Sequence, residues 1–180
     1  MRRMIVVEGP DGSGKSTLLA QLAETFEVEP SHSGGPPKTE AEWQQKLQLI
    51  WGMKWRADRG DTVLVDRLPH ISEPIYGGLI GRTFCGPLAR LDREIIELNL
   101  VIVYCKAISA SFMQSRISTQ AKDHKPTAHL EWVLKNYPNI VSAYDRRIGT
   151  LCGQVPIVHY SWPNETYENL LEKIKCAASC

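Results

Sequence analysis

The sequence predicts an α/β fold of three layers, in which helices cover both faces of a central parallel sheet. Short apolar runs rich in valine, isoleucine and leucine are typical of strands buried on both faces, and they occur at residues 4–8, 62–65, 100–104 and 155–158. Segments with helical spacing of apolar residues lie between these runs. Strands that alternate with helices in this way form parallel sheets.

Apolar residues three or four positions apart mark the expected helices. These helices span residues 15–26, 39–59, 72–80, 87–97, 109–117, 129–148 with an interruption near Pro138, and 165–175. In the second helix, Thr39 can cap the N-terminus, and Glu42 stands three positions later. Residues 30–37 are rich in proline, glycine and serine and predict a loop.

The composition is ordinary for a globular protein, and 180 residues without a linker or repeat fit a single domain over residues 1–180. Lysine and arginine number 21 against 20 aspartate and glutamate residues, so no strong field points to nucleic acid. No apolar run is long enough to span a bilayer, and we expect neither a membrane nor a nucleic acid as partner. The five cysteines are not spaced like metal ligands, so we expect no structural zinc. Their odd number and spacing predict reduced thiols, which are typical of a cytoplasmic protein.

A glycine-rich motif follows the first predicted strand. Residues 9–16 read GPDGSGKS and match G-x-x-x-x-G-K-[ST] at every fixed position. The backbone N–H groups of such a loop bind phosphate oxygens, Lys15 reaches the β- and γ-phosphates, and Ser16 ligates Mg²⁺. A chance glycine-rich turn is the alternative, but the buried strand before the motif and the amphipathic helix after it favour a P-loop. The residues expected to bind ATP are Gly9, Asp11, Gly12, Ser13, Gly14, Lys15, Ser16, Thr17 and Arg116.

Two stretches resemble thymidylate kinases. Residues 8–17, with the sequence EGPDGSGKST, resemble the E-G-x-D-G-x-G-K-[ST]-T loop of that family. Residues 66–76, with the sequence DRLPHISEPIY, resemble its D-R-[YF]-x-x-S-x-x-A-[YF] segment. The resemblance implies a P-loop kinase fold, with a central parallel five-stranded sheet, and an enzyme of nucleotide biosynthesis. Such an enzyme uses Mg²⁺ and ATP to phosphorylate a deoxynucleoside monophosphate, with dTMP as the first choice, to the diphosphate.

By this resemblance, Asp11 contacts the sugar of the acceptor, and Tyr76 lies near its sugar or base. Asp66 helps hold Mg²⁺ through water, so the expected metal-binding residues are Ser16 and Asp66. Arg67 grips the acceptor phosphate, a role that suits a guanidinium. An ion pair at the end of the strand is the alternative for Asp66 and Arg67. The residues expected to bind the acceptor are Asp11, Pro37, Arg67, Ser72 and Tyr76.

Some thymidylate kinases carry an arginine inside the P-loop, where this sequence has Gly12. The positive charge for the transition state is therefore expected from a lid at residues 118–127, which contains Lys122 and Lys125 but no arginine. Arg116 resembles the arginine that borders the lid near ATP. A solvated loop is the alternative for the two lysines. The residues predicted to be catalytic are Lys15, Asp66, Arg67, Arg116, Lys122 and Lys125.

The sequence also departs from the thymidylate kinase pattern, at Leu68 and Pro69 and in the segment 33–38. These differences fit a divergent, viral-type member with altered or relaxed acceptor specificity. Members of the family usually form dimers, so a homodimer is an option here. Two other functions stay open. One is a small P-loop kinase that acts on a nucleoside, a modified dUMP or a non-nucleotide, and the other is a nucleotide-binding switch without catalysis.

Tryptophan and arginine residues outside these motifs have less specific signals. Trp43, Trp51 and Trp55 are spaced along one face of the second helix, where they could stack on a base, although packing in the core explains the spacing better. Trp132 is expected to pack in the core as well. Arg147 is expected on a solvated face of a late helix.

Overall fold

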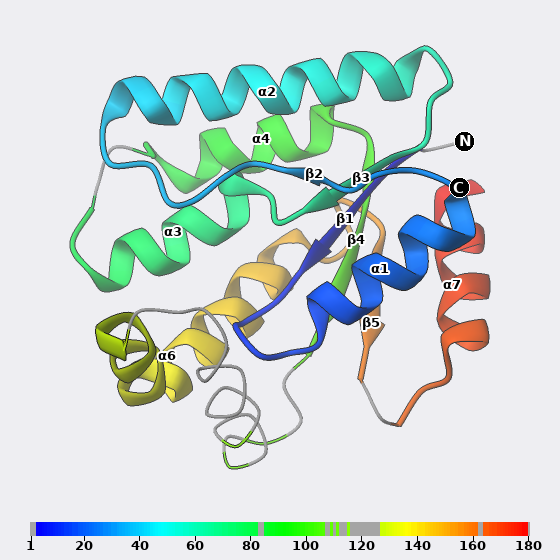
Figure 1. Cartoon of the computed structure of the whole chain (residues 1–180). Helices are drawn as coiled ribbons and strands as arrows, with labels where there is room; N and C mark the ends of the chain where they lie inside the picture. The colour runs from blue at the N-terminus through cyan, green and yellow to red at the C-terminus, as the bar shows by residue number, and fades with distance from the viewer. Residues whose placement is uncertain are drawn as a thin grey trace.

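The computed structural model describes residues 3–82, 85–106, 109, 111, 115, 127–161 and 164–179, with residues 127–130 described by their backbone alone. Five strands form one parallel sheet in the order β2-β3-β1-β4-β5 (Figure 1). The strands are β1 (Met4–Glu8), β2 (Ser31–His32), β3 (Val63–Asp66), β4 (Leu100–Cys105) and β5 (Ile157–Tyr160). The helices are α1 (Lys15–Phe26), α2 (Glu40–Asp58), α3 (Pro69–Leu79), α4 (Leu88–Glu97), α6 (Thr127–Leu151) and α7 (Tyr167–Ser179). The predicted α/β fold with a parallel five-stranded sheet is confirmed.

The alternation of side chains along the strands divides the core into two layers. Met4 and Val6 of β1 pack on one face of the sheet with residues from α2, α3, α4 and α6. Ile5 and Val7 pack on the other face with residues from α1 and α7, which Figure 1 shows together on one side of the sheet. All four side chains are at most 3% exposed, as is usual for a central strand of a parallel sheet. Helices therefore cover both faces, which gives the expected three layers.

Several element boundaries differ from the sequence prediction. Ser31–His32 form the edge strand β2 inside the segment that was expected to be a loop, and they pair with Val65 and Asp66. A strand of two residues has no apolar alternation, so only its pairing with β3 reveals it. Helix α3 begins at Pro69 and not at residue 72, because proline suits the first turn of a helix, where its missing N–H is not needed. Strand β5 begins at Ile157 and not at residue 155.

Helix α6 continues through Pro138, where the sequence predicted an interruption. Proline removes one backbone hydrogen bond, but the buried side chains of Tyr137, Ile140 and Tyr144 pack this part of the helix into the core. Neither α6 nor any other helix of the described part is long and apolar enough to cross a membrane. Most of the helix expected at 109–117 lies outside the described residues.

Helix α2 begins as predicted, since Thr39 Oγ1 accepts a hydrogen bond of 3.2 Å from the backbone N–H of Glu42. Trp43 is buried, but Trp51 and Trp55 are 37% and 60% exposed. The expectation of one packed tryptophan face is therefore wrong for the last two. Positions eight and twelve residues beyond Trp43 lie about 80° and 120° further around an α-helix, which turns them away from the core.

Buried polar side chains join α3, α4 and α6. His70 is fully buried, and its Nε2 lies 3.0 Å from Oε2 of Glu94. Arg147 is also buried, pairs with Asp92, and donates a hydrogen bond of 3.2 Å to the carbonyl oxygen of His70. The expectation of a solvated Arg147 is wrong, because this face of α6 packs against α3 and α4. Burial lowers the pKa of His70 to about 4, and the Glu94 carboxylate only partly opposes this shift.

We expect His70 to determine part of the pH dependence of stability below neutrality. The unfolded chain protonates this side chain below about pH 6.5, whereas the folded protein does so only near pH 4, so the unfolded state binds more protons between these values. The free energy of unfolding should therefore decrease as the pH falls from 6.5 to 4. In urea unfolding experiments this decrease should be smaller for His70→Gln and unchanged for the exposed control His159→Gln. Identical pH profiles for the wild type and His70→Gln would contradict the prediction.

Candidate active site

The predicted phosphate-binding loop connects β1 to α1 and needs glycine for two different reasons. At Gly9, with φ at +143°, a Cβ atom would lie only 2.4 Å from the carbonyl oxygen of Cys105 on the neighbouring strand. Gly14 has φ at +90° and caps the N-terminus of α1. Residues 9–14 form the loop, and Lys15, Ser16 and Thr17 form the first turn of the helix. The free N–H groups of that turn make the loop a suitable anion site.

Lys15 is the cation of this loop. Its side chain is only 7% exposed, and its Nζ donates a hydrogen bond of 2.6 Å to the carbonyl oxygen of Pro10. Burial, followed by the charge of Arg67, lowers the pKa of Lys15 to about 8. A phosphate anion in the loop would oppose both effects, so phosphate binding and the protonation of Lys15 should favour one another.

Arg67 follows the last residue of β3 and turns back toward the loop. Its backbone has φ at +63°, a left-handed conformation that costs a non-glycine residue roughly 1–2 kcal/mol. Its Nη2 donates to Oδ1 of Asp11 at 2.7 Å, and its Nη1 donates to the hydroxyl of Tyr144 at 2.6 Å. These two bonds fix the guanidinium beside the predicted phosphate-binding loop.

Glu8 links the loop to the segment that carries Arg67. Its carboxylate is fully buried, and Oε1 accepts a hydrogen bond of 2.5 Å from the backbone N–H of Leu68. Oε2 accepts hydrogen bonds from the backbone N–H of Gly9 at 3.3 Å and from the hydroxyl of Tyr144 at 3.2 Å. Burial raises the pKa of Glu8, and the charge of Arg67 opposes that rise. In the sequence Glu8 stands out only as part of a strand and a motif, and no pattern there marks Tyr144 as a site residue.

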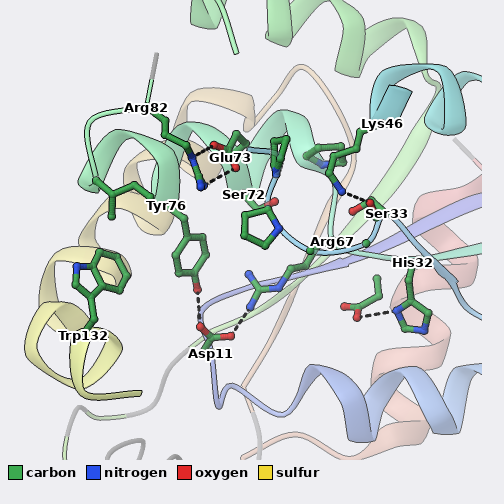
Figure 2. Close-up of a pocket in the computed structure, with 17 residues that line it drawn as sticks. Asp11, His32, Ser33, Lys46, Arg67, Ser72, Glu73, Tyr76, Arg82 and Trp132 are labelled. Carbon is green, nitrogen blue, oxygen red and sulfur yellow. Dashed lines mark hydrogen bonds and ion pairs between the residues drawn. The ribbon is translucent and has the colours of Figure 1, made fainter. Parts of the chain in front are cut away.

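A cavity of about 740 Å³ opens beside the loop (Figure 2). All of the residues predicted to bind the acceptor line it, namely Asp11, Pro37, Arg67, Ser72 and Tyr76. They come from the loop, from the segment after β2, from the end of β3 and from α3. The structure thus brings them together, and their role in binding an acceptor stays a prediction.

Tyr76 forms part of the wall between the loop and α3. Its hydroxyl donates a hydrogen bond of 3.3 Å to Oδ2 of Asp11, and the guanidinium carbon of Arg67 lies 5.3 Å from the centre of its ring. Burial raises the pKa of Tyr76 to about 12, so it is a neutral hydrogen-bond donor. Figure 2 shows Trp132 on the same side of the cavity, where its ring could stack on a planar ligand. Trp132 packs against the core, as expected, and it lines the cavity as well.

The cavity also contains charged residues that the sequence analysis missed: Lys46, Glu73 and Arg82, together with His32. Lys46 donates a hydrogen bond to the carbonyl oxygen of Ser33. Solvated positions on helices and loops carry the same residue types, so no pattern in the sequence singled these residues out. Of the predicted catalytic residues, Arg116, Lys122 and Lys125 lie outside the described part of the chain, as does the predicted lid up to residue 126.

The predicted metal-binding residues are Ser16 on the first turn of α1 and Asp66 at the carboxyl end of β3. The register pairs Asp66 with Val7 of β1, so its carboxylate lies beside the strand that leads into the loop. Oδ2 of Asp66 also lies 3.1 Å from Nδ1 of His32. A hydroxyl and a carboxylate are the hard oxygen ligands that Mg²⁺ prefers. The donor set therefore fits Mg²⁺.

No family model and no curated protein sequence matches the chain. Several solved structures share its fold. YorR from Bacillus subtilis, solved with phosphorylated GDP, is 18% identical with a TM-score of 0.63, and the match covers 94% of this chain and 91% of YorR. Deoxyadenosine kinase from M. mycoides, solved with dCMP and dCDP, is 14% identical with a TM-score of 0.57 and 96% coverage of both chains. A gluconokinase from Sinorhizobium meliloti 1021 is 16% identical with a TM-score of 0.52, covering 99% of this chain and 94% of the kinase. The chain therefore has the fold of P-loop kinases.

We expect Tyr144→Phe to destabilise the protein through the buried network. The substitution removes the acceptor of an Arg67 hydrogen bond and a donor to Glu8, which should lower the free energy of unfolding by about 1–3 kcal/mol. Tyr137→Phe is the matched control, because its buried hydroxyl on the same helix has no hydrogen-bond partner in the described structure. Its effect should stay within about 0.5 kcal/mol. Equal losses in urea unfolding for the two variants would argue against the network.

Proposed function

We propose that the protein is an ATP-dependent kinase that phosphorylates a nucleoside monophosphate bound in the cavity, with dTMP as the first candidate. The position of Arg67 is the observation that carries this proposal. Its guanidinium lies on the wall of the cavity, is fixed by Asp11 and Tyr144, and belongs to a segment tied through Glu8 to the phosphate-binding loop. A fixed guanidinium at this junction suits an acceptor phosphate next to the γ-phosphate of ATP.

The contacts of the cavity carboxylates are compatible with a phosphate acceptor. A kinase for nucleosides needs a general base for the attacking hydroxyl. Asp11 contacts Arg67 and Tyr76, Asp66 contacts His32, and Glu73 contacts Arg82. Every carboxylate that lines the described cavity thus has a partner, and each keeps lone pairs for a further hydrogen bond. A phosphate acceptor is ionised at neutral pH and requires no such base.

The similar structures add support from what was bound in them. YorR was solved with phosphorylated GDP, and deoxyadenosine kinase was solved with its product dCMP and with dCDP, so both similar structures hold nucleotides. Because a kinase forms dCMP from a nucleoside, the second structure also keeps a nucleoside acceptor open for this fold. The choice of dTMP rests on the resemblance of the loop and of the Asp66–Arg67 segment to thymidylate kinases. Sugar kinases share the fold too, so the nature of the acceptor must be tested directly.

The proposed reaction is an in-line transfer. Lys15 and the N–H groups of the loop hold the β- and γ-phosphates of ATP, and Arg67 holds the acceptor phosphate. An acceptor oxygen forms a bond to the γ-phosphorus while the bond from that phosphorus to the β–γ bridging oxygen breaks, so that ADP leaves. Ser16 and Asp66 would hold Mg²⁺, which supplies positive charge at the phosphates when bound.

A panel of acceptors tests this proposal. With ATP and Mg²⁺, we expect the diphosphate to form from dTMP and no product to form from thymidine or gluconate. Lys15→Ala should lower the rate at least about 100-fold, because it removes a cation from the transition state. Lys173→Ala is the control, since this lysine is exposed and pairs with Glu165 near α7. Phosphorylation of thymidine but not dTMP would overturn the assignment, and ATP binding without turnover of any acceptor would favour a nucleotide switch.

Arg67→Ala tests the role of the guanidinium. We expect it to raise KM for the monophosphate and to lower kcat by at least about 100-fold, because Arg67 would contact both the acceptor phosphate and the transferred group. The KM for ATP should change much less. Arg56→Ala is a control for loss of a partly exposed arginine, because Arg56 lies on α2 and pairs with Asp61. If only the affinity for ATP falls, Arg67 serves the donor and its proposed role is wrong.

A further inference from the structure

The cavity has a second charged feature, which the proposed reaction does not use. Glu73 of α3 is only 4% exposed, and Arg82 follows the end of this helix. Nε of Arg82 lies 2.7 Å from Oε1 of Glu73, and Nη2 lies 3.0 Å from Oε2. Figure 2 shows this pair across the cavity from Asp11. The two charged ends of the cavity are thus formed by different ion pairs.

The local backbone makes room for this pair. A Cβ atom on Gly77 would lie 2.4 Å from Oε1 of Glu73, so only glycine leaves the carboxylate in its place. The N–H of Arg82 donates to the carbonyl oxygen of Gly77 at 2.8 Å, which holds the start of the next segment against the helix. Glycine inside a helix costs about 1 kcal/mol relative to alanine. Its presence here keeps the Glu73–Arg82 pair at the wall of the cavity.

Stability alone is a weak reason for such a pair. Desolvation of a buried ion pair cancels much of its Coulomb energy, and apolar residues of similar volume often stabilise a protein as well or better. Burial raises the pKa of Glu73, and the bonds to Arg82 oppose that rise. The neighbouring lining is largely apolar or aromatic, with Pro36, Ile80 and Trp132. A fixed polar edge in such a cavity is typical of ligand recognition.

The chemistry of the pair matches the edge of a nucleobase. Carboxylate oxygens only accept hydrogen bonds, guanidinium N–H groups only donate them, and Arg82 uses two of its five N–H groups on Glu73. A base presents a donor beside an acceptor on its pairing edge. In thymine, uracil and guanine the donor is a ring N–H next to a carbonyl, and this N–H is more acidic than an exocyclic amine. It should therefore gain more from a charged acceptor.

We propose that Glu73 and Arg82 together bind the pairing edge of the acceptor base and select bases that carry a ring N–H beside a carbonyl. In this arrangement Glu73 accepts from the ring N–H, and Arg82 donates to the carbonyl oxygen. The inference rests on the proposed function, because it assigns the opposite end of the same cavity to the acceptor phosphate. Tyr76 and Trp132 would contact the faces of the base between these ends.

The test compares Glu73→Gln and Arg82→Gln with the wild type. For each protein, kcat/KM is measured with dTMP, dUMP, dGMP, dCMP and dAMP, and affinities of the same monophosphates are measured by calorimetry. The preference is the ratio of kcat/KM for dTMP, dUMP and dGMP to kcat/KM for dCMP and dAMP. In both variants we expect this ratio to fall at least about tenfold, which corresponds to 1.4 kcal/mol. The KM for ATP should stay unchanged. The matched controls Asp58→Asn and Arg90→Gln change residues of exposed ion pairs on α2 and α4 and should leave the preference as it is.

Gly77→Ala provides an independent variant, because it displaces the Glu73 carboxylate without removing either charged group. It should shift the preference in the same direction. If the Glu73–Arg82 pair has only a structural role, kcat/KM should fall by the same factor for all five acceptors. That result would overturn the inference while the proposed function stands. If no monophosphate is turned over, a change in binding preference still supports base recognition although the proposed reaction is wrong. Unchanged binding preferences, or no binding of any monophosphate, would reject base recognition by Glu73 and Arg82.

Discussion

The buried carboxylate of Glu8 is the contact on which the candidate site depends. It stands at the end of the central strand β1 and accepts hydrogen bonds from both main-chain segments that form the site, through the N–H groups of Gly9 and Leu68. A carboxylate without partners would be very costly at this depth. The nearby charges of Lys15 and Arg67, which oppose the rise in the pKa of Glu8, compensate for burial. The end of strand β1 thus fixes the predicted phosphate-binding loop and the Arg67 segment relative to each other.

Arg67 connects the segment after β3 to the loop directly. Its left-handed backbone turns the chain after β3 so that the side chain returns to the loop, and the bonds to Asp11 and Tyr144 offset the strain. Tyr144 connects Glu8 and Arg67 directly, since its hydroxyl contacts both. Helix α6 therefore reaches the centre of the site, and its continuation through Pro138 has a functional consequence under the proposed function. The same helix carries Trp132 to the wall of the cavity.

Much of the fold could be predicted from local patterns. The strands β1, β3 and β4 are nearly continuous apolar runs, and Thr39 with Glu42 marks the start of α2. Local patterns failed where distant contacts decide the outcome. The two residues of β2 are a strand only through pairing with β3, and Trp51 and Trp55 are exposed because the helical period turns them away from Trp43. Arg147 is buried because partners from α3 and α4 neutralise and hold it.

The sequence by itself determined where a phosphate-binding loop is expected and identified Asp11, Arg67 and Tyr76 as candidates, because those motifs are short and their residues lie close together along the chain. Only the tertiary structure decided that these residues meet in one cavity with Lys46, Glu73 and Arg82. Side chains on α2, on α3 and after α3 converge there through packing of helices on the sheet. Polar residues of this kind have no periodic signal, since one charged residue on a helix looks the same in a sequence whether it faces water or a ligand cavity.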